Sequence, residues 1–122
     1  MVQEQLITES IAFGFRKRFV DIVGTVTISK NSLIFEGKKM SYLTGKGKGE
    51  LIREEIYFKN ITHVEQLGLS DNKGMIHLDY SENKIKKVLS FGNYIGGFMG
   101  FNRLNPKYPM RELLKIIENK IK

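Results

Sequence analysis

The segment 24–37, GTVTISKNSLIFEG, constrains the fold of this chain more than any other stretch. Up to Ile28, apolar residues recur at a period of two and β-branched residues dominate, which is typical of a half-buried strand. The turn residues Lys30-Asn31-Ser32 follow, and Asn suits a turn because it tolerates a positive φ and hydrogen-bonds its own backbone. Residues 33–36 then return as a second strand, which Gly37 ends. The segment therefore predicts a β-hairpin.

The same alternation recurs along most of the chain. It predicts strands at residues 9–15, 20–28, 33–36, 51–58, 61–67, 75–80 and 85–91. Glu54 interrupts the apolar face of its strand, which we interpret as an exposed strand end. The segment 38–49 contains three glycines and four lysines without a sustained period and predicts a loop. Strands at intervals of roughly 8 to 12 residues favour a sandwich or barrel over parallel βαβ units.

The period changes near the end of the chain. Residues 110–121 carry an apolar stripe with helical spacing, formed by Met110, Leu113, Leu114, Ile117 and Ile121. Pro109 suits a first helical turn, where its missing N–H has no partner to lose. The pattern predicts an amphipathic helix over 110–121, whereas residues 1–8 are expected to form a flexible lead-in.

Composition predicts one domain spanning residues 1–122, because a chain of 122 residues can bury a core of its own. The chain contains no cysteine, so disulfides and thiolate metal sites are excluded. Its first residues lack a basic segment followed by an apolar core, and no apolar run approaches the ~20 residues that cross a bilayer. We expect a cytoplasmic protein without a transmembrane segment, able to act peripherally at a membrane.

Positive charge is in excess and unevenly distributed. Twenty Lys and Arg residues against 13 Asp and Glu residues give a net charge of +7, which favours anionic partners such as phospholipid headgroups, nucleic acid or an acidic protein. The segments 37–49 and 83–111 contain several basic residues and no acidic one. A lysine-rich surface that serves only solubility is the alternative.

The order of these elements resembles the GRAM and bacterial pleckstrin-homology-like domains of the PH-like barrel superfamily. The first predicted strand opens with Glu9-Ser10-Ile11. Residues 24–35 are similar to that family's "G-x-L-x-(I/L)-T … L-I-F" hairpin, and residues 56–64, IYFKNITHV, to its "I-x-(Y/L)-x-x-I-x-x-V" segment. A late hairpin and a C-terminal helix follow, so the resemblance covers residues 9–121. It implies a bent antiparallel barrel of about seven strands with the helix plugging one open end. It also implies non-catalytic binding of lipids or proteins.

In a PH-like barrel the first hairpin and its neighbouring loops lie at the rim, where lysines can meet phosphates. On that analogy, the predicted residues for binding anions or lipids are Lys30, Lys38, Lys39, Lys46 and Lys48. Lysine acts as a point charge, so we expect electrostatic rather than stereospecific recognition. A flexible, solvated loop is the alternative.

The glycine-rich segment 95–101 is a second candidate surface. Its apolar side chains could enter a membrane interface or a partner's groove beside a basic residue, and the predicted contact residues are Phe98, Met99, Phe101 and Arg103. Alternatively, the two phenylalanines pack back onto the barrel or the helix.

No pattern in the chain indicates an enzyme or a cofactor. Six of the serines lie in no nucleophile elbow or His-adjacent context: Ser10, Ser32, Ser41, Ser70, Ser81 and Ser90. A metal site would need His63 and His77 together with Asp79 or Glu65, but two histidines in strands are more typical of surface residues. Single-stranded nucleic acid is a weaker alternative partner, because no RNP-like sequence, recognition helix or zinc knuckle is present. A protein–protein adaptor without lipid binding remains open.

Overall fold

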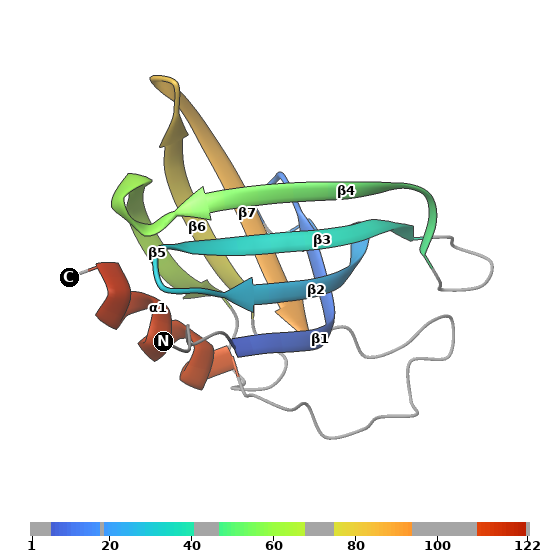
Figure 1. Ribbon diagram of the computed structural model, residues 1–122, viewed down its shortest axis with the longest axis horizontal. Coiled ribbons are helices and arrows are strands. Elements are labelled where there is room, and N and C mark those ends of the chain that lie inside the picture. Colours follow the sequence, from blue (N-terminus) through green and yellow to red (C-terminus); the bar gives the residue numbers. More distant parts are fainter. Residues whose placement is uncertain (1–5, 18, 41–46, 68–74, 94–109, 122) are drawn as a thin grey trace.

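The computed structural model describes residues 6–17, 19–40, 47–67, 75–93 and 110–121. Within these ranges the chain forms seven strands, one short 3-10 helix and one α-helix (Figure 1). The elements are β1 (Leu6–Gly14), β2 (Ile22–Ile28), β3 (Ser32–Met40), β4 (Gly47–Tyr57), η1 (Phe58–Asn60), β5 (Ile61–Leu67), β6 (Met75–Glu82), β7 (Ile85–Asn93) and α1 (Met110–Ile121). The predicted mostly-β fold with one C-terminal helix is confirmed.

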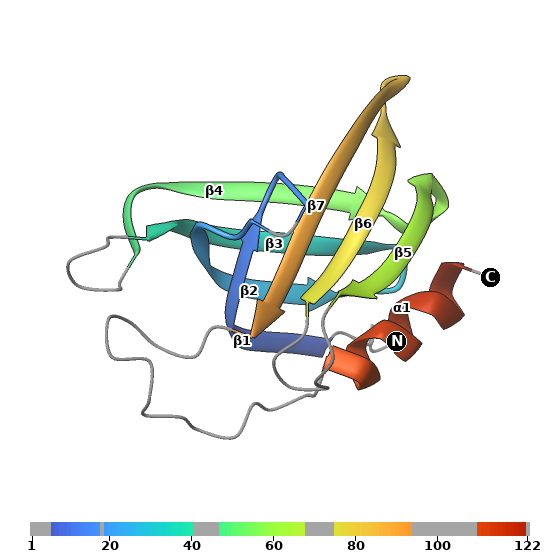
Figure 2. The same cartoon turned by 180° about the vertical axis from the view of Figure 1, so that it is seen from behind.

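The strands form one antiparallel sheet in the order β4-β3-β2-β1-β7-β6-β5. The long strand β1 pairs with both β2 and β7, and the sheet bends there, so that β2–β4 cross in front of β5–β7 (Figures 1 and 2). The strands β4 and β5 form the two edges of this sheet. The bent barrel that the family resemblance implies is therefore not closed: the sheet is open along the seam between β4 and β5.

Three predicted strand boundaries differ from the structure by more than two residues. The first strand begins at Leu6, inside the expected lead-in. The strands β3 and β4 extend into the segment predicted as a loop, where Lys39 pairs with Lys48 and Met40 with Gly47. Backbone hydrogen bonds hold this extension, and they do not require an apolar side-chain period.

The glycines that bound the first hairpin are required by the close approach of its strands. Gly24 and Gly37 are direct partners in the register of β2 and β3. A Cβ atom on Gly24 would overlap the carbonyl of Glu36, and one on Gly37 would overlap that of Val23. Any larger residue would push the two strands apart.

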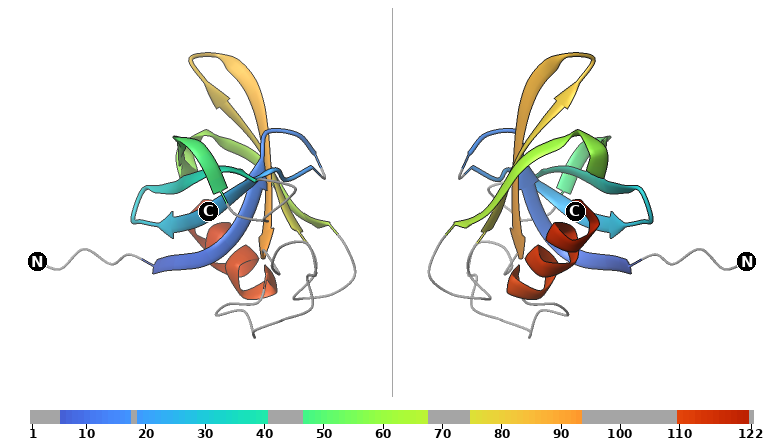
Figure 3. Two further views of the ribbon diagram at one scale, coloured as in Figure 1. Left: turned by 90° about the vertical axis from the view of Figure 1, so that its right-hand side faces the viewer. Right: turned by 90° about the vertical axis from the view of Figure 1, so that its left-hand side faces the viewer.

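The core fills the space between the two halves of the bent sheet. Phe35 is central: its ring lies 5.3 Å from that of Phe13 and 5.0 Å from that of Phe91. The helix α1 covers one end of this core, with Leu113 and Ile117 fully buried against β5, η1 and β6 (Figure 3). That coverage leaves the opposite end of the sheet free of α1.

Candidate anion-binding surface

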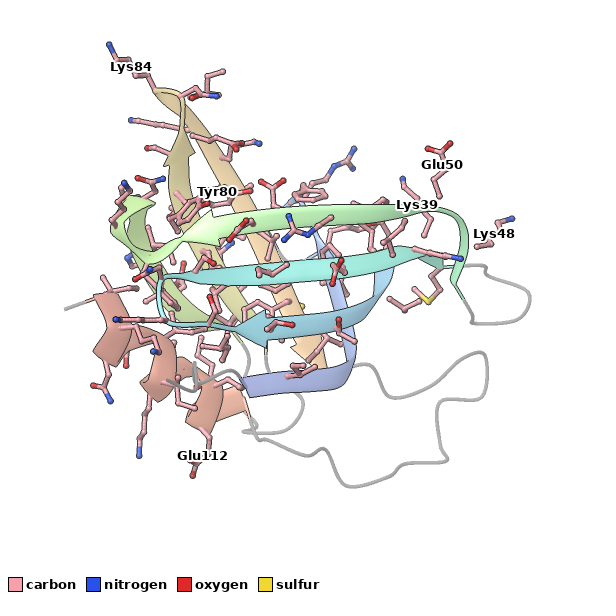
Figure 4. All side chains as sticks on the ribbon, viewed as in Figure 1. Lys39, Lys48, Glu50, Tyr80, Lys84 and Glu112 are labelled. Atoms are coloured by element: carbon pink, nitrogen blue, oxygen red, sulfur yellow. The ribbon has the colours of Figure 1, made fainter. Side chains whose placement is uncertain are left out.

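The end of the β3–β4 hairpin carries three exposed lysines, Lys38, Lys39 and Lys48, which we call the basic hairpin end. Lys39 and Lys48 are direct cross-strand partners and both reach outward from the strand ends (Figure 4). Like charges directly opposite each other in an antiparallel pair are destabilising. This position therefore favours any anion that lies between or beside the two ammonium groups.

A bulge in β4 separates the basic hairpin end from the rest of the sheet. Between the pairs Gly37–Ile52 and Lys39–Lys48, β3 has one residue and β4 has three. Gly49 lies in this bulge with a φ of +88°, a conformation that other residues rarely adopt. Such bulges bend a strand and redirect its side chains.

Asp21 connects the basic hairpin end to the beginning of β2. Its Oδ2 lies 3.3 Å from Lys39 Nζ, and its carbonyl accepts a hydrogen bond from the backbone N–H of Met40 at 2.8 Å. Neither Lys38 nor Lys48 makes an ion pair within the described part of the chain. Among the described residues, two of the three ammonium groups therefore have no competing carboxylate.

Lys30 lies far from the other predicted lysines. It belongs to the turn between β2 and β3, next to η1, where the Phe58 N–H donates to the Asn31 carbonyl at 2.9 Å. Lys39 pairs with Ile22 at the other end of the same hairpin. The expectation that Lys30 shares a rim with Lys38 and Lys39 is wrong, because a hairpin turn and the open end of that hairpin are separated by its full length. The predicted residues Lys46, Phe98, Met99, Phe101 and Arg103 lie outside the described residues.

The connection between β1 and β2 is a basic and aromatic surface that the sequence analysis did not select. Phe15 is 40% exposed and Phe19 is 43% exposed, and they flank the exposed Arg16 and Lys17. The Arg16 Cζ atom lies 5.6 Å from the centre of the Phe19 ring. This connection lies away from α1, as the basic hairpin end does (Figures 1 and 3). The sequence FRKRF at residues 15–19 could have indicated this surface, because it places three basic residues between two phenylalanines.

His77 lies on the outer face of β6, and it is buried although its sequence pattern is more typical of a surface residue. His77 is only 2% exposed, with Nδ1 3.1 Å from Ser90 Oγ and Nε2 2.9 Å from Asp79 Oδ1. Ser90 therefore does lie beside a histidine, contrary to the prediction, because β6 and β7 place His77 and Ser90 directly opposite each other. The Ser90 hydroxyl is fully buried. This geometry orients the imidazole and gives a substrate no access to the hydroxyl.

The four residues considered for a metal occupy neighbouring positions of β5 and β6. His63 is opposite Asp79, and Glu65 is opposite His77. Among the residues described by the structure, however, no three His, Cys, Asp or Glu side chains are arranged to hold a metal ion. Both ring nitrogens of His77 are already engaged.

Glu54 does not mark an exposed strand end. Its side chain is 16% exposed and faces the seam, where its Oε2 accepts a hydrogen bond from Tyr80 Oη at 2.7 Å and lies 3.4 Å from Lys87 Nζ. Burial and this hydrogen bond raise the pKa of Tyr80 above its ordinary value. A hydrogen bond to Glu82 raises the pKa of Lys87. The carboxylate that breaks the apolar pattern of β4 thus joins β4 to β6 and β7.

A pocket of about 290 Å³ opens at the same seam, between the end of β4 with η1 and the end of β6. Its lining includes Glu55, Lys59, Tyr80 and Glu82. Two carboxylates beside one ammonium group do not suit an anionic ligand. The basic hairpin end remains the better candidate for anion binding.

Comparisons with known proteins add no relative: no family model matches the chain, and no curated protein is significantly similar to it. Among the described residues, no helix is long and apolar enough to span a bilayer.

Proposed function

We propose that this chain is a non-catalytic binding module that docks on anionic membrane surfaces through the end of the sheet away from α1. The observation that carries the proposal is the cross-strand pair of Lys39 and Lys48. An antiparallel pair of like charges costs free energy in the isolated protein, and lipid phosphates would offset that cost. The PH-like or GRAM-like resemblance of the sequence is consistent with such a role and is part of the proposal.

Electrostatics supports a surface rather than a single ligand pocket. Each lysine near an anionic membrane contributes about 1 kcal/mol, and the effect falls off within a Debye length of about 10 Å at 0.1 M salt. Lys38 and Lys48 have no competing ion pair among the described residues, and Lys39 has one, at an exposed position. Three such charges at the end of the β3–β4 hairpin would together contribute about 3 kcal/mol, which favours reversible recruitment.

The exposed aromatic rings favour a membrane over an acidic protein. Phe15 and Phe19 are exposed beside Arg16 and Lys17, and apolar rings next to basic side chains suit the headgroup–acyl boundary. An acidic protein surface would use the charges and leave the two rings without an apolar environment.

Vesicle flotation tests the proposal. We expect the protein to float with phosphatidylcholine vesicles that contain phosphatidylserine at low salt, and to be released at high salt, whereas pure phosphatidylcholine should recruit little. Neutralising the basic hairpin end with Lys38→Ala, Lys39→Ala and Lys48→Ala should weaken recruitment about tenfold or more.

A matched control carries the same change in net charge at other places. Lys30→Ala, Lys59→Ala and Lys115→Ala neutralise three exposed lysines in the β2–β3 turn, η1 and α1. Equal losses in the two triple variants would mean that recruitment follows net charge and uses no particular surface. If anionic vesicles recruit nothing at low salt, the membrane proposal fails and an acidic protein partner becomes the better hypothesis.

A further inference from the structure

Among the strands that the structure describes, β4 has no partner along one edge, over residues 51–57. On its other side it pairs with β3 in an unbroken register from Ser32–Tyr57 to Gly37–Ile52. In the sheet order β4 is terminal, and in Figure 1 it runs above β3 and crosses in front of β6 and β7. A long terminal strand presents free backbone groups that can accept another strand.

The hydrogen bond from Phe58 N–H to the Asn31 carbonyl fixes which backbone groups are free. It lies one step beyond the Ser32–Tyr57 pair, so Phe58 points its backbone groups toward β3. Direction alternates along an antiparallel strand, so Ile56, Glu54 and Ile52 also point to β3. The residues that direct N–H and C=O to the open side are therefore Leu51, Arg53, Glu55 and Tyr57.

The same four residues carry the side chains on the outer face of β4. Leu51 is 59% exposed and Tyr57 is 44% exposed. Between them lie Arg53 and Glu55, at 51% and 28% side-chain exposure. Within the chain Arg53 meets Glu36 and Glu55 only at 3.7 Å, so these ion pairs are long and weak. The row reads apolar, basic, acidic, apolar.

The order of these four side chains is complementary to the same order in a second copy that runs in the opposite direction. In an antiparallel pair centred on Glu54, Leu51 lies opposite Tyr57 of the second copy, and Arg53 lies opposite Glu55 of the second copy. Moving the centre to Arg53 places arginine opposite arginine, and moving it to Glu55 places glutamate opposite glutamate. Apolar and opposite-charge pairs stabilise a sheet, whereas like-charge pairs destabilise it. One register is therefore favoured over its neighbours.

Glu54, the residue at the centre of this register, already has polar partners within its own chain. It faces inward, accepts a hydrogen bond from Tyr80 and lies beside Lys87. The two Glu54 carboxylates at the two-fold axis would therefore each keep a hydrogen bond and a positive charge beside them.

From this self-complementary edge we infer that two copies of the chain associate through β4, in an antiparallel pair around a two-fold axis at Glu54. The two sheets become continuous across the interface. This inference does not rest on the proposed membrane function. The edge at residues 51–57 contains none of the three lysines of the basic hairpin end.

Charge exchange between two variants tests the inference. The variants Arg53→Glu and Glu55→Arg each place like charges opposite each other when the variant is alone, so each should self-associate roughly ten- to a hundredfold more weakly than the wild type. Mixed in equal amounts they restore both opposite-charge pairs, and a heterodimer should form. Analytical ultracentrifugation over a concentration series measures all three samples.

The control is Lys115→Glu, a charge reversal on the exposed face of α1 that should leave association unchanged. Circular dichroism shows whether each variant is folded, and the double variant Arg53→Glu, Glu55→Arg should dimerise by itself. A wild type that stays monomeric at millimolar concentration overturns the inference. So does a folded pair of single variants that fails to associate on mixing, or a single variant that dimerises as well as the wild type.

Discussion

The two ends of the bent sheet differ in what their residues do. At one end, α1 seals the core with Leu113 and Ile117, both fully buried, and η1 packs beneath it. At the other end, β3 and β4 run past the core and present Lys38, Lys39 and Lys48 to solvent. The first end gains free energy by removing apolar surface from water. The second holds like charges opposite each other, which costs free energy and favours an external partner.

Because the two ends are built differently, stability and binding can be altered largely separately in this molecule. Changes beneath α1 should affect folding and leave binding intact in the molecules that remain folded. Changes at the basic hairpin end should alter binding and change the free energy of unfolding only slightly.

The largest expected effect comes from opening the core under the helix. Leu113→Ala should lower the free energy of unfolding by about 3 kcal/mol, because it removes buried methyl groups and leaves a cavity. Urea denaturation followed by circular dichroism measures the loss, and Lys115→Ala on the exposed face of α1 is the control. A decrease in the free energy of unfolding of less than about 1 kcal/mol would contradict the conclusion that α1 is the main cover of this end of the core.

The seam between the ends should show an intermediate effect. Tyr80→Phe removes the hydrogen bond to Glu54 and should cost about 1.5 kcal/mol at neutral pH. Exposed Tyr57→Phe is the matched control and should change stability by less than about 0.5 kcal/mol.

Alkaline pH tests the same contact. Because the pKa of Tyr80 is raised in the folded state, the stability it contributes is complete below the ordinary value of 10.0 and is lost as pH rises above it. Thermal unfolding from pH 8 to 11 should show that loss in the wild type and a shallower decline in Tyr80→Phe. Equal slopes would mean that Tyr80 is not held as a neutral donor.

A smaller effect of opposite sign is expected at the basic hairpin end. Lys48→Glu replaces the like-charge pair with Lys39 by an opposite-charge pair, so it should raise the free energy of unfolding by about 0.5 kcal/mol. The same change should reduce flotation with anionic vesicles. Denaturant unfolding and flotation of the one variant separate the two effects, and a loss of stability would contradict the assigned cross-strand pair.

The smallest effect concerns an exposed contact between the β1–β2 connection and β5. Lys17 Nζ lies 3.3 Å from Glu65 Oε1, and this interaction lowers the pKa of Glu65 below its ordinary value of 4.5. The small stabilisation from this carboxylate is present above that value and lost as pH falls through the lower folded pKa. An NMR titration of the Glu65 carboxyl should show the pKa return toward 4.5 in Lys17→Ala and stay low in Lys59→Ala.

Local patterns predicted most elements because each depends on neighbours in sequence. The alternation in residues 20–28 predicted which side chains of β2 face the core, and Ile22, Val26 and Ile28 are indeed buried. The helical stripe gave α1 with both bounds correct. The extension of β3 to Met40 was missed, since glycine- and lysine-rich strands have no such period and depend on their partner.

The candidate site was predicted only in part, because it depends on distances across the fold. Lys38, Lys39 and Lys48 do lie together, whereas Lys30 is separated from them by the length of a hairpin. His77 gave no local sign of burial, since its partners Ser90 and Asp79 reach it through strand pairing.

Periodicity, turn chemistry and composition act over a few residues, and they were enough to predict most of the elements, their antiparallel class and the excess of positive charge. Which charges became neighbours depended on the tertiary structure. It placed Glu54 beside Tyr80 and Lys87 and put Lys39 opposite Lys48, and among the described strands it left β4 without a partner along one edge. Register and sheet order, which no local pattern encodes, are the physical reason.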